Sequence, residues 1–320
     1  MDEQSGTVRV PKPAHPHVRR APLPWQRPKP PEEDADALPR VQALLTSPGY
    51  RLADTDVEYL AQNDTRGVRL QLDYQKAETL LEYHAIEHTI VVFGSTRIPE
   101  PDSARRRVDE LRAVARGDAQ AEGQLRVAER ILDKSRYYEV ARELGRLVGR
   151  ADDSPHFRMV VMTGGGPGIM EAANRGAFDA GAKTVGLNIN LPHEQYPNPY
   201  ITPDLCFRFH YFAVRKLHFL LRAKALVVFP GGYGTCDELF ETLALIQTRK
   251  IAPLPIVLVG EEFWRRAISI DFMIDEGVID AEDGELFWYA ETAAQIWDGI
   301  LEWYRASASP LGPDSGGESQ

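Results

Sequence analysis

Short apolar runs alternate with longer amphipathic segments along most of this chain. Seven runs have the length of a strand, at residues 89–93, 158–162, 184–188, 205–209, 225–229, 255–259 and 286–289. The segments between them carry apolar positions at helical spacing. Strands that alternate with helices predict a parallel sheet that helices cover on both faces. The expected fold is therefore α/β, with a doubly wound, Rossmann-like parallel sheet.

Two helical segments add to this plan. Residues 40–88 precede the first strand, and their pattern predicts an N-terminal helical extension. Residues 101–155 lie between the first two strands, and their charged helical pattern predicts a helical insertion. We expect both segments to belong to a single Rossmann-like domain that spans residues 40–306.

The two ends of the chain differ from this domain in composition. Residues 1–39 are rich in proline and mixed charge, and residues 307–320 are polar with several glycines. Such segments bury too little apolar surface to fold. We therefore expect a disordered arm at residues 1–39 and a disordered tail at residues 307–320.

The overall composition narrows the class of protein. Hydrophobic residues make up 43% of the chain and charged residues 26%, as in ordinary globular proteins. The net charge of -10 argues against a surface that coats nucleic acid. There is no apolar run of about 18 residues, as a membrane span needs, and no apolar core of a signal peptide near the N-terminus. Cys206 and Cys236 are the only cysteines. We expect a cytoplasmic protein that binds neither nucleic acid nor membrane.

Three loops with glycines follow predicted strands directly, at residues 94–97, 164–168 and 231–235. The carboxyl ends of parallel strands meet at one edge of a sheet. Ligands of such folds bind at that edge, where the strand order reverses. The three loops are therefore expected to converge on one site.

The loop at residues 231–235 is the most informative of the three. The strand before it runs into a Pro-Gly-Gly turn, and a helix is expected to begin near Thr235. Glycines and a helix N-terminus together offer backbone N–H groups to an anion such as phosphate. Glu238 is expected in the first helical turn, where the helix dipole would keep it ionised. A phosphate cradle with a carboxylate at its rim predicts chemistry on a nucleotide or a sugar phosphate.

Other cofactor sites find little support in the sequence. In a G-x-G-x-x-G fingerprint that begins at Gly164, the third glycine would fall at Ile169. The next strand should end in an acid that binds the ribose, but it ends in Asn188-Ile-Asn190. NAD is therefore not expected. The P-loop pattern G-x-x-x-x-G-K-[ST] does not occur. The nearby histidines, at 193, 210 and 218, lack metal-ligand spacing. We expect no metal and no cofactor.

Taken together, the motifs resemble the Lonely Guy family. Residues 230–238 read P-G-G-Y-G-T-C-D-E and match the family pattern P-G-G-x-G-T-x-x-E in full. Arg215-Lys216 matches the family's R-K pair, and Gly94-Ser95 matches its G-S after the first strand. Residues 164–170 are similar to the family's G-G-G-x-x-G-x-M, with the last glycine one place early. The resemblance covers residues 89–259 apart from the insertion.

The resemblance implies a nucleoside 5′-monophosphate phosphoribohydrolase, which splits the N-glycosidic bond to give a free base and ribose 5-phosphate. AMP or a cytokinin riboside monophosphate is the implied substrate, and the large size of this variant favours AMP. The implied catalytic residues are Glu238 and Arg215, and Glu238 would stabilise positive charge on the ribose or orient water. Asp237 and Glu241 are candidates for the group that protonates the leaving base. The implied binding residues are Gly94, Ser95, Gly165, Gly166, Gly168, Met170, Lys216, Gly231, Gly232, Gly234, Thr235 and Glu241.

Alternative functions stay open at this point. A non-catalytic carrier of a nucleotide or of molybdenum cofactor is one, since related folds bind that cofactor. Many relatives are labelled lysine decarboxylases, but no lysine here is placed as an evident Schiff-base site. A homo-oligomer, in the simplest case a two-fold dimer, is also expected, because the helix predicted at residues 212–223 is apolar on more than one face.

Overall fold

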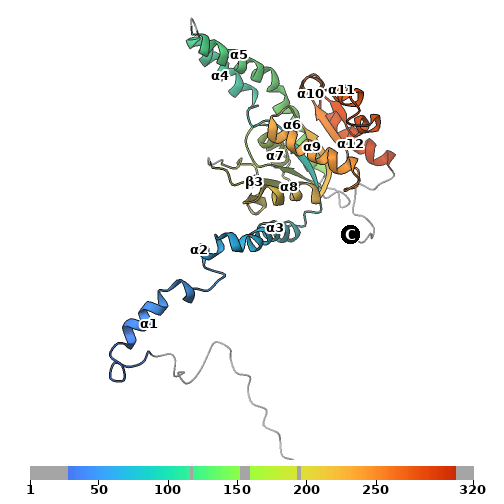
Figure 1. The fold of residues 1–320 in the computed structure, drawn as a ribbon. Coiled ribbons are helices and arrows are strands. Elements are labelled where there is room, and N and C mark those ends of the chain that lie inside the picture. The colour runs from blue at the N-terminus through green and yellow to red at the C-terminus, as the bar shows by residue number, and fades with distance from the viewer. Residues whose placement is uncertain (1–27, 116–117, 152–158, 193–195, 308–320) are drawn as a thin grey trace, which may run out of the picture. The chain divides into compact units, whose positions relative to one another are not determined.

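The computed structural model describes residues 28–115, 118–151, 159–192 and 196–307 (Figure 1). Most of the predicted arm at residues 1–39, and all but the first residue of the predicted tail at residues 307–320, lie outside these residues. By its internal contacts the chain divides into two units, Met1–Arg66 and Gly67–Gln320. The α/β unit thus begins at residue 67, whereas the sequence pattern predicts that it begins at residue 40.

The first unit consists of short helical pieces. These are α1 (Ala37–Leu45), η2 (Pro48–Tyr50), α2 (Val57–Leu60) and η3 (Asn63–Thr65). The carboxylate of Asp56 caps α2 by accepting a hydrogen bond from the backbone N–H of Tyr59 at 3.1 Å. A helical pattern is thus present in this segment, but it is interrupted every few residues and forms no long helix.

The second unit is built on a sheet of seven parallel strands, which confirms the predicted doubly wound fold. The strand order is β4-β3-β2-β1-β5-β6-β7. The chain therefore moves outward from β1 to β4 and then returns to the other side of β1 with β5. This reversal places the switch point, where ligands of such sheets bind, between β1 and β5. The strands are β1 (His88–Phe93), β2 (Met159–Thr163), β3 (Thr184–Ile189), β4 (Cys206–Phe209), β5 (Ala223–Val228), β6 (Ile256–Val259) and β7 (Trp288–Ala290).

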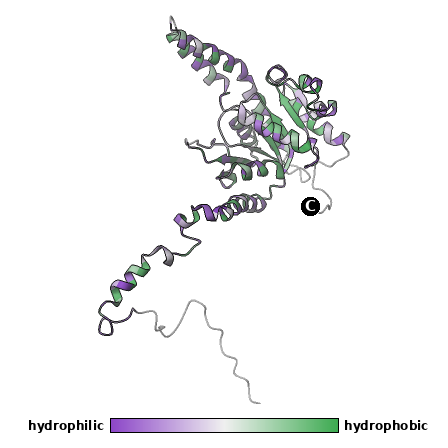
Figure 2. Cartoon of the chain, viewed as in Figure 1, coloured by the Kyte–Doolittle hydropathy of each residue, from purple (hydrophilic) through white to green (hydrophobic). Residues whose placement is uncertain are grey.

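Helices cover both faces of the sheet and bury its strands, which stand out as apolar in Figure 2. Side chains alternate between the faces along each strand, so Ile90 and Val92 face one core while Val91 and Phe93 face the other. The first core includes α6 (Arg136–Ala151), α7 (Ile169–Asp179) and α12 (Ala293–Ala306). The second core includes α3 (Arg66–Tyr83), α8 (Phe212–Leu221), α9 (Tyr233–Gln247) and α10 (Glu261–Ala267). The smaller pieces η4 (Pro203–Leu205), α11 (Ile270–Asp275) and η5 (Ala281–Glu285) complete the unit.

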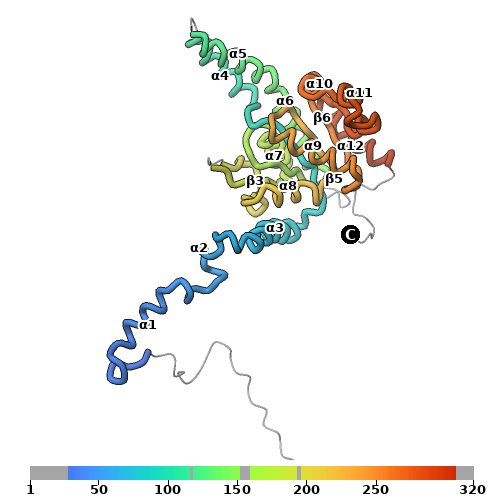
Figure 3. Tube along the Cα trace, in the orientation of Figure 1, coloured from blue at the N-terminus to red at the C-terminus, as the bar shows by residue number. Residues whose placement is uncertain are grey.

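The segment predicted as one helical insertion has two different roles. Helix α6 is a sheet-covering helix, since Tyr138, Ala141 and Leu144 are buried in the first core. Helices α4 (Pro101–Val114) and α5 (Ala119–Lys134) form a separate pair, whose traces run side by side in Figures 1 and 3. This pair has its own small core around Val108 and Leu111. Only α4 and α5 are therefore additional to the α/β plan.

None of the helices in the described residues combines the length and the apolar character that crossing a membrane requires.

Candidate functional site

A cavity of about 570 Å³ lies at the switch point of the sheet. Its walls come from the loops after β1, β2, β3 and β5 and from the N-terminal parts of α7, α8 and α9, so the loops after β1, β2 and β5 do converge as predicted. The lining residues are Phe93, Gly94, Ser95, Thr96, Arg97, Gly164, Met170, Ile189, Leu191, Phe212, Arg215, Gly232, Tyr233, Gly234, Thr235, Asp237 and Glu238.

The N-terminus of α9 opens directly into this cavity. The helix begins at Tyr233, after Gly232, and no side chain caps it. The first N–H groups of a helix have no intrahelical partner, and they carry the positive end of the helix dipole. Tyr233, Gly234 and Thr235 form this first turn and line the cavity. This arrangement suits a phosphate group.

Glu238 lies one turn further into α9 than the sequence predicts. Because the helix begins at Tyr233 and not near Thr235, Glu238 falls in the second turn, and the first turn contains no acidic residue. The carboxyl group still lines the cavity, but only 5% of the residue is exposed. Burial in the second turn, and not the helix dipole of the first, therefore decides its chemistry.

Arg215 faces Glu238 across the cavity wall. Its Nη1 atom lies 3.7 Å from Oε1 of Glu238, and the two side chains are 12% and 7% exposed. The Nε–H group of Arg215 donates a hydrogen bond of 2.6 Å to the carbonyl oxygen of Leu187. The guanidinium carbon also lies 4.9 Å from the ring centre of Phe219. These contacts fix the guanidinium group beside the carboxylate.

The pair is buried at an electrostatic cost. Burial raises the pKa of Glu238 to about 7, although Arg215 and Lys216 act in the opposite direction. Burial likewise lowers the pKa of Arg215, and here Glu238 opposes the change. Both changes show that the loss of hydration outweighs the attraction across 3.7 Å. The prediction that Glu238 is held ionised is therefore wrong, because the carboxyl group titrates near neutral pH.

Lys216 forms ion pairs with Asp237 and Glu241 instead of lining the cavity. Its Nζ atom lies 3.1 Å from Asp237 Oδ1 and 3.2 Å from Glu241 Oε2. Neither Lys216 nor Glu241 lines the cavity, whereas Asp237 does. The lysine therefore orients Asp237 at the rim.

The loop after β2 contributes one glycine and one methionine to the cavity. A Cβ atom on Gly164 would lie 2.7 Å from Nη2 of Arg215 and 2.9 Å from Sδ of Met170, so glycine is needed for this close approach. The next glycines face away, and the carbonyls of Gly165 and Gly166 accept hydrogen bonds from Asn198 at 2.9 and 3.1 Å. The loop thus shapes the site mainly by its packing.

Eight of the predicted site residues line the cavity and six do not. Those that line it are Gly94, Ser95, Met170, Arg215, Gly232, Gly234, Thr235 and Glu238. Those that do not are Gly165, Gly166, Gly168, Lys216, Gly231 and Glu241. Gly168 instead has a φ of 73° and packs against the backbone of Ser95, which holds two of the loops together.

Several lining residues are absent from the sequence prediction. The charged one is Arg97, two residues after the G-S motif, and its position in the loop at residues 94–97 is the only signal that could have found it. Ile189, Leu191 and Phe212 provide apolar walls, for which the sequence offers no motif.

The described residues contain no group of three or more His, Cys, Asp or Glu side chains that could hold a metal ion. His218 is fully buried and stacks on the ring of Tyr74 at 5.0 Å, while position 193 lies outside the described residues. The cavity therefore offers two guanidinium groups, carboxyl groups and a helix N-terminus as its chemical groups.

Parts of the chain are similar in sequence to known proteins. A family model described as "Possible lysine decarboxylase" matches residues 170–300. A probable cytokinin riboside 5′-monophosphate phosphoribohydrolase of Oryza sativa subsp. japonica is 28% identical over 163 residues, which are 50% of this chain and 68% of that protein. A cytokinin riboside 5′-monophosphate phosphoribohydrolase of Arabidopsis thaliana is 28% identical over 169 residues, 51% of this chain and 74% of that protein.

Two further matches are a sequence match over a shorter part of the chain and a match to a solved structure. A pyrimidine/purine nucleotide 5′-monophosphate nucleosidase of Escherichia coli (strain K12) is 30% identical over 138 residues, 38% of this chain and 28% of that protein. A solved structure of a Northeast Structural Genomics Consortium target covers 68% of this chain and 99% of its own, with a TM-score of 0.42 and 23% identity. The sequence matches to the named phosphoribohydrolases confirm the resemblance to the Lonely Guy family that the motifs indicate.

Proposed function

We propose that the protein hydrolyses the N-glycosidic bond of a nucleoside 5′-monophosphate to a free base and ribose 5-phosphate. The observation that carries this proposal is the buried Arg215–Glu238 pair beside the uncapped N-terminus of α9 in one cavity. The names of the relatives describe this class of reaction. AMP is the substrate that we favour, with a cytokinin riboside monophosphate as the second choice.

The 5′-phosphate binds at the N-terminus of α9 in this proposal. The backbone N–H groups from Gly232 to Thr235 and the dipole of α9 attract the dianion. Ser95, which lines the same cavity, adds a hydroxyl group. Fixing the phosphate also fixes the ribose, because a short chain of bonds connects them. The anomeric carbon then lies near Glu238, one helical turn further along.

Glu238 and Arg215 act on the glycosidic bond. As this bond breaks, the base takes the electron pair and positive charge develops on the ribose. A carboxyl group that titrates near pH 7 is suited to accept the proton of an attacking water, whose oxygen bonds to C1′. Arg215 holds the carboxylate in place and compensates its charge. Of the two candidate proton donors to the leaving base, Asp237 and Glu241, only Asp237 lines the cavity, and Nζ of Lys216 lies 3.1 Å from its Oδ1.

The test is incubation of the full chain with AMP and measurement of both products. Adenine and ribose 5-phosphate should appear in equal amounts, and Glu238→Gln should lower turnover by about 10²–10⁴-fold. Absence of turnover on a panel of nucleoside monophosphates would overturn the proposal. Binding of AMP without turnover would favour the non-catalytic carrier.

A decarboxylase finds no support in the geometry of the site. None of the described residues that line the cavity is a lysine, and Lys216 outside it is paired with two carboxylates. A Schiff base to a carbonyl cofactor needs a lysine in the cavity. The purified protein should therefore show no absorbance band of an internal aldimine.

We also propose that the protein forms a homo-oligomer through α8. Phe212, Leu217 and Leu221 on this helix are 51%, 46% and 46% exposed. A second copy that packs on them would bury apolar surface next to the cavity. Light scattering at micromolar concentration decides the point, since full activity at a mass near 35.9 kDa excludes the oligomer.

A further inference from the structure

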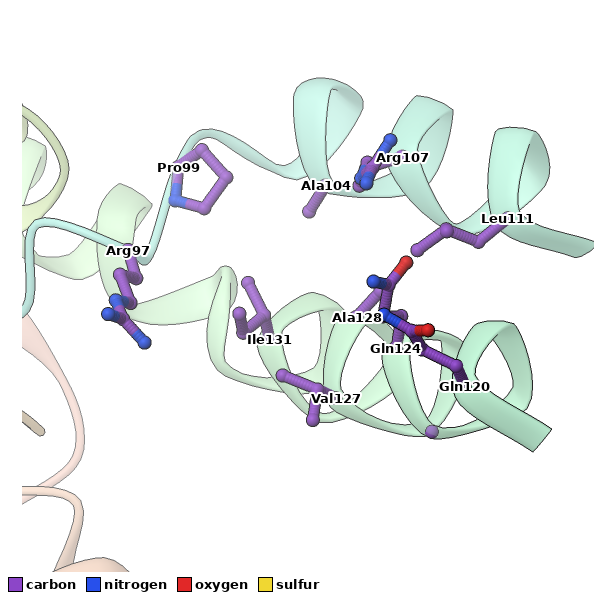
Figure 4. A pocket seen from close by; sticks show the side chains of 11 residues that line it. Arg97, Pro99, Ala104, Arg107, Leu111, Gln120, Gln124, Val127, Ala128 and Ile131 are labelled. Atoms are coloured by element: carbon purple, nitrogen blue, oxygen red, sulfur yellow. The ribbon is translucent and has the colours of Figure 1, made fainter.

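A second cavity, of about 500 Å³, lies between α4 and α5 outside the switch point (Figure 4). Its size is within the range of about 300–1,000 Å³ that is typical of small-molecule sites. Most of its wall is apolar, with Pro99, Leu111, Val127 and Ile131 among the lining residues. One residue, Arg97, lines this cleft and also the cavity at the switch point.

Small residues keep the cleft open. Ala104 on α4 and Gly123 and Ala128 on α5 line it, where larger side chains would fill the space between the helices. A glycine inside a helix costs about 1 kcal/mol relative to alanine. Nothing local requires Gly123, because a Cβ atom there would meet only the guanidinium group of Arg126 at 3.7 Å. Because Gly123 has no side chain, the space beside it in the cleft stays open.

The charged residues that line the cleft are both cationic, in a chain with a net charge of -10. Arg107 pairs with Glu110 at 3.2 Å on the exposed side of α4. Arg97 is exposed, and within the described part of the chain no carboxylate lies within ion-pair distance of it. The amide groups of Gln120 and Gln124 add neutral hydrogen-bonding groups. The cleft is therefore complementary to an apolar molecule that carries one negative charge.

We propose that the cleft between α4 and α5 is a binding site for a small organic acid with an apolar body. The apolar body packs against the apolar walls from α4 and α5, and the acid group pairs with Arg97. Because Arg97 also lines the cavity at the switch point, a bound acid withdraws this cation from an anionic ligand there. An acid bound in the cleft therefore inhibits the reaction at the switch-point cavity. Only this inhibitory role rests on the proposed function.

Fluorescence titration with 8-anilinonaphthalene-1-sulfonate tests the site, since this probe joins aromatic rings to one sulfonate. The full chain should bind one equivalent saturably. Gly123→Phe, which fills the cleft from a position with room for a side chain, should weaken binding at least tenfold. Arg97→Met should weaken it about three- to tenfold. Ala121→Phe adds the same ring to α5 at a residue that does not line the cleft, and it should leave the affinity unchanged.

The outcomes separate the two proposals. Unsaturable binding, or equal affinity in the wild type and Gly123→Phe, refutes the organic-acid site whether or not AMP is hydrolysed. If AMP is hydrolysed, the probe should raise the KM for AMP in the wild type and not in Gly123→Phe. Inhibition that persists in Gly123→Phe places the probe in the switch-point cavity and overturns the inhibitory role of the cleft.

Discussion

Glu238 should make the folded protein less stable as the pH rises. Its pKa is about 7 in the folded chain and has the ordinary value of 4.5 when exposed. Between these values the unfolded chain releases the proton and the folded chain keeps it, so the free energy of unfolding falls with increasing pH. The contribution of the protonated group is complete below pH 4.5 and is lost above pH 7.

The size of this effect follows from the pKa change. One pH unit corresponds to about 1.4 kcal/mol, so the change from 4.5 to about 7 amounts to about 3 kcal/mol. Solvent screening takes little from this value, because the residue is only 5% exposed. Glu238→Gln has no proton to lose, and its stability relative to the wild type should therefore increase by about 3 kcal/mol between pH 4.5 and pH 8.

Urea unfolding of both proteins at pH 4.5, 6, 7 and 8 measures this difference. The loss of a partner for Arg215 in the variant gives a constant offset, which cancels when values at different pH are compared. Glu139→Gln is the matched control, because it removes a carboxyl group from an exposed position of α6 that does not line the cavity. A stability difference that is constant from pH 4.5 to pH 8, or that shrinks, would show that burial does not control the proton of Glu238.

Three further predictions concern activity. The kcat/KM for AMP should rise with pH up to about 7 and then level off, because Glu238, the proposed base, must be deprotonated. A decrease in kcat/KM from pH 6 to pH 8 would show that Glu238 acts as an acid instead. Adenosine should be a far poorer substrate than AMP in both kcat and KM, since it lacks the group that α9 binds, and comparable rates would contradict the phosphate site. Gly164→Ala should lower kcat/KM at least tenfold by displacing Arg215, whereas Gly67→Ala on α3 has open space for its methyl group and should have no effect.

The sequence alone determined the α/β architecture and the place of the site. Strands buried on both faces are continuous apolar runs, so their positions are readable without a partner, and the predicted run at residues 184–188 differs from β3 by one residue. Parallel strands also bring their carboxyl ends to one edge by necessity. The convergence of the loops at residues 94–97, 164–168 and 231–235 follows from that rule. Only the family resemblance predicts Arg215 as a site residue, and its place beside Glu238 comes from the structure.

The tertiary structure decided what depends on packing between distant segments. Sequence pattern cannot distinguish α6, which covers the sheet, from α4 and α5, which pack on each other, because all three have similar helical patterns. It cannot show that Lys216 turns from the cavity toward two carboxylates. The pKa of Glu238 is likewise set by burial, which the residues around it create only once the chain is folded. For the same reason the sequence does not reveal the cleft between α4 and α5, nor that this cleft shares Arg97 with the switch-point cavity.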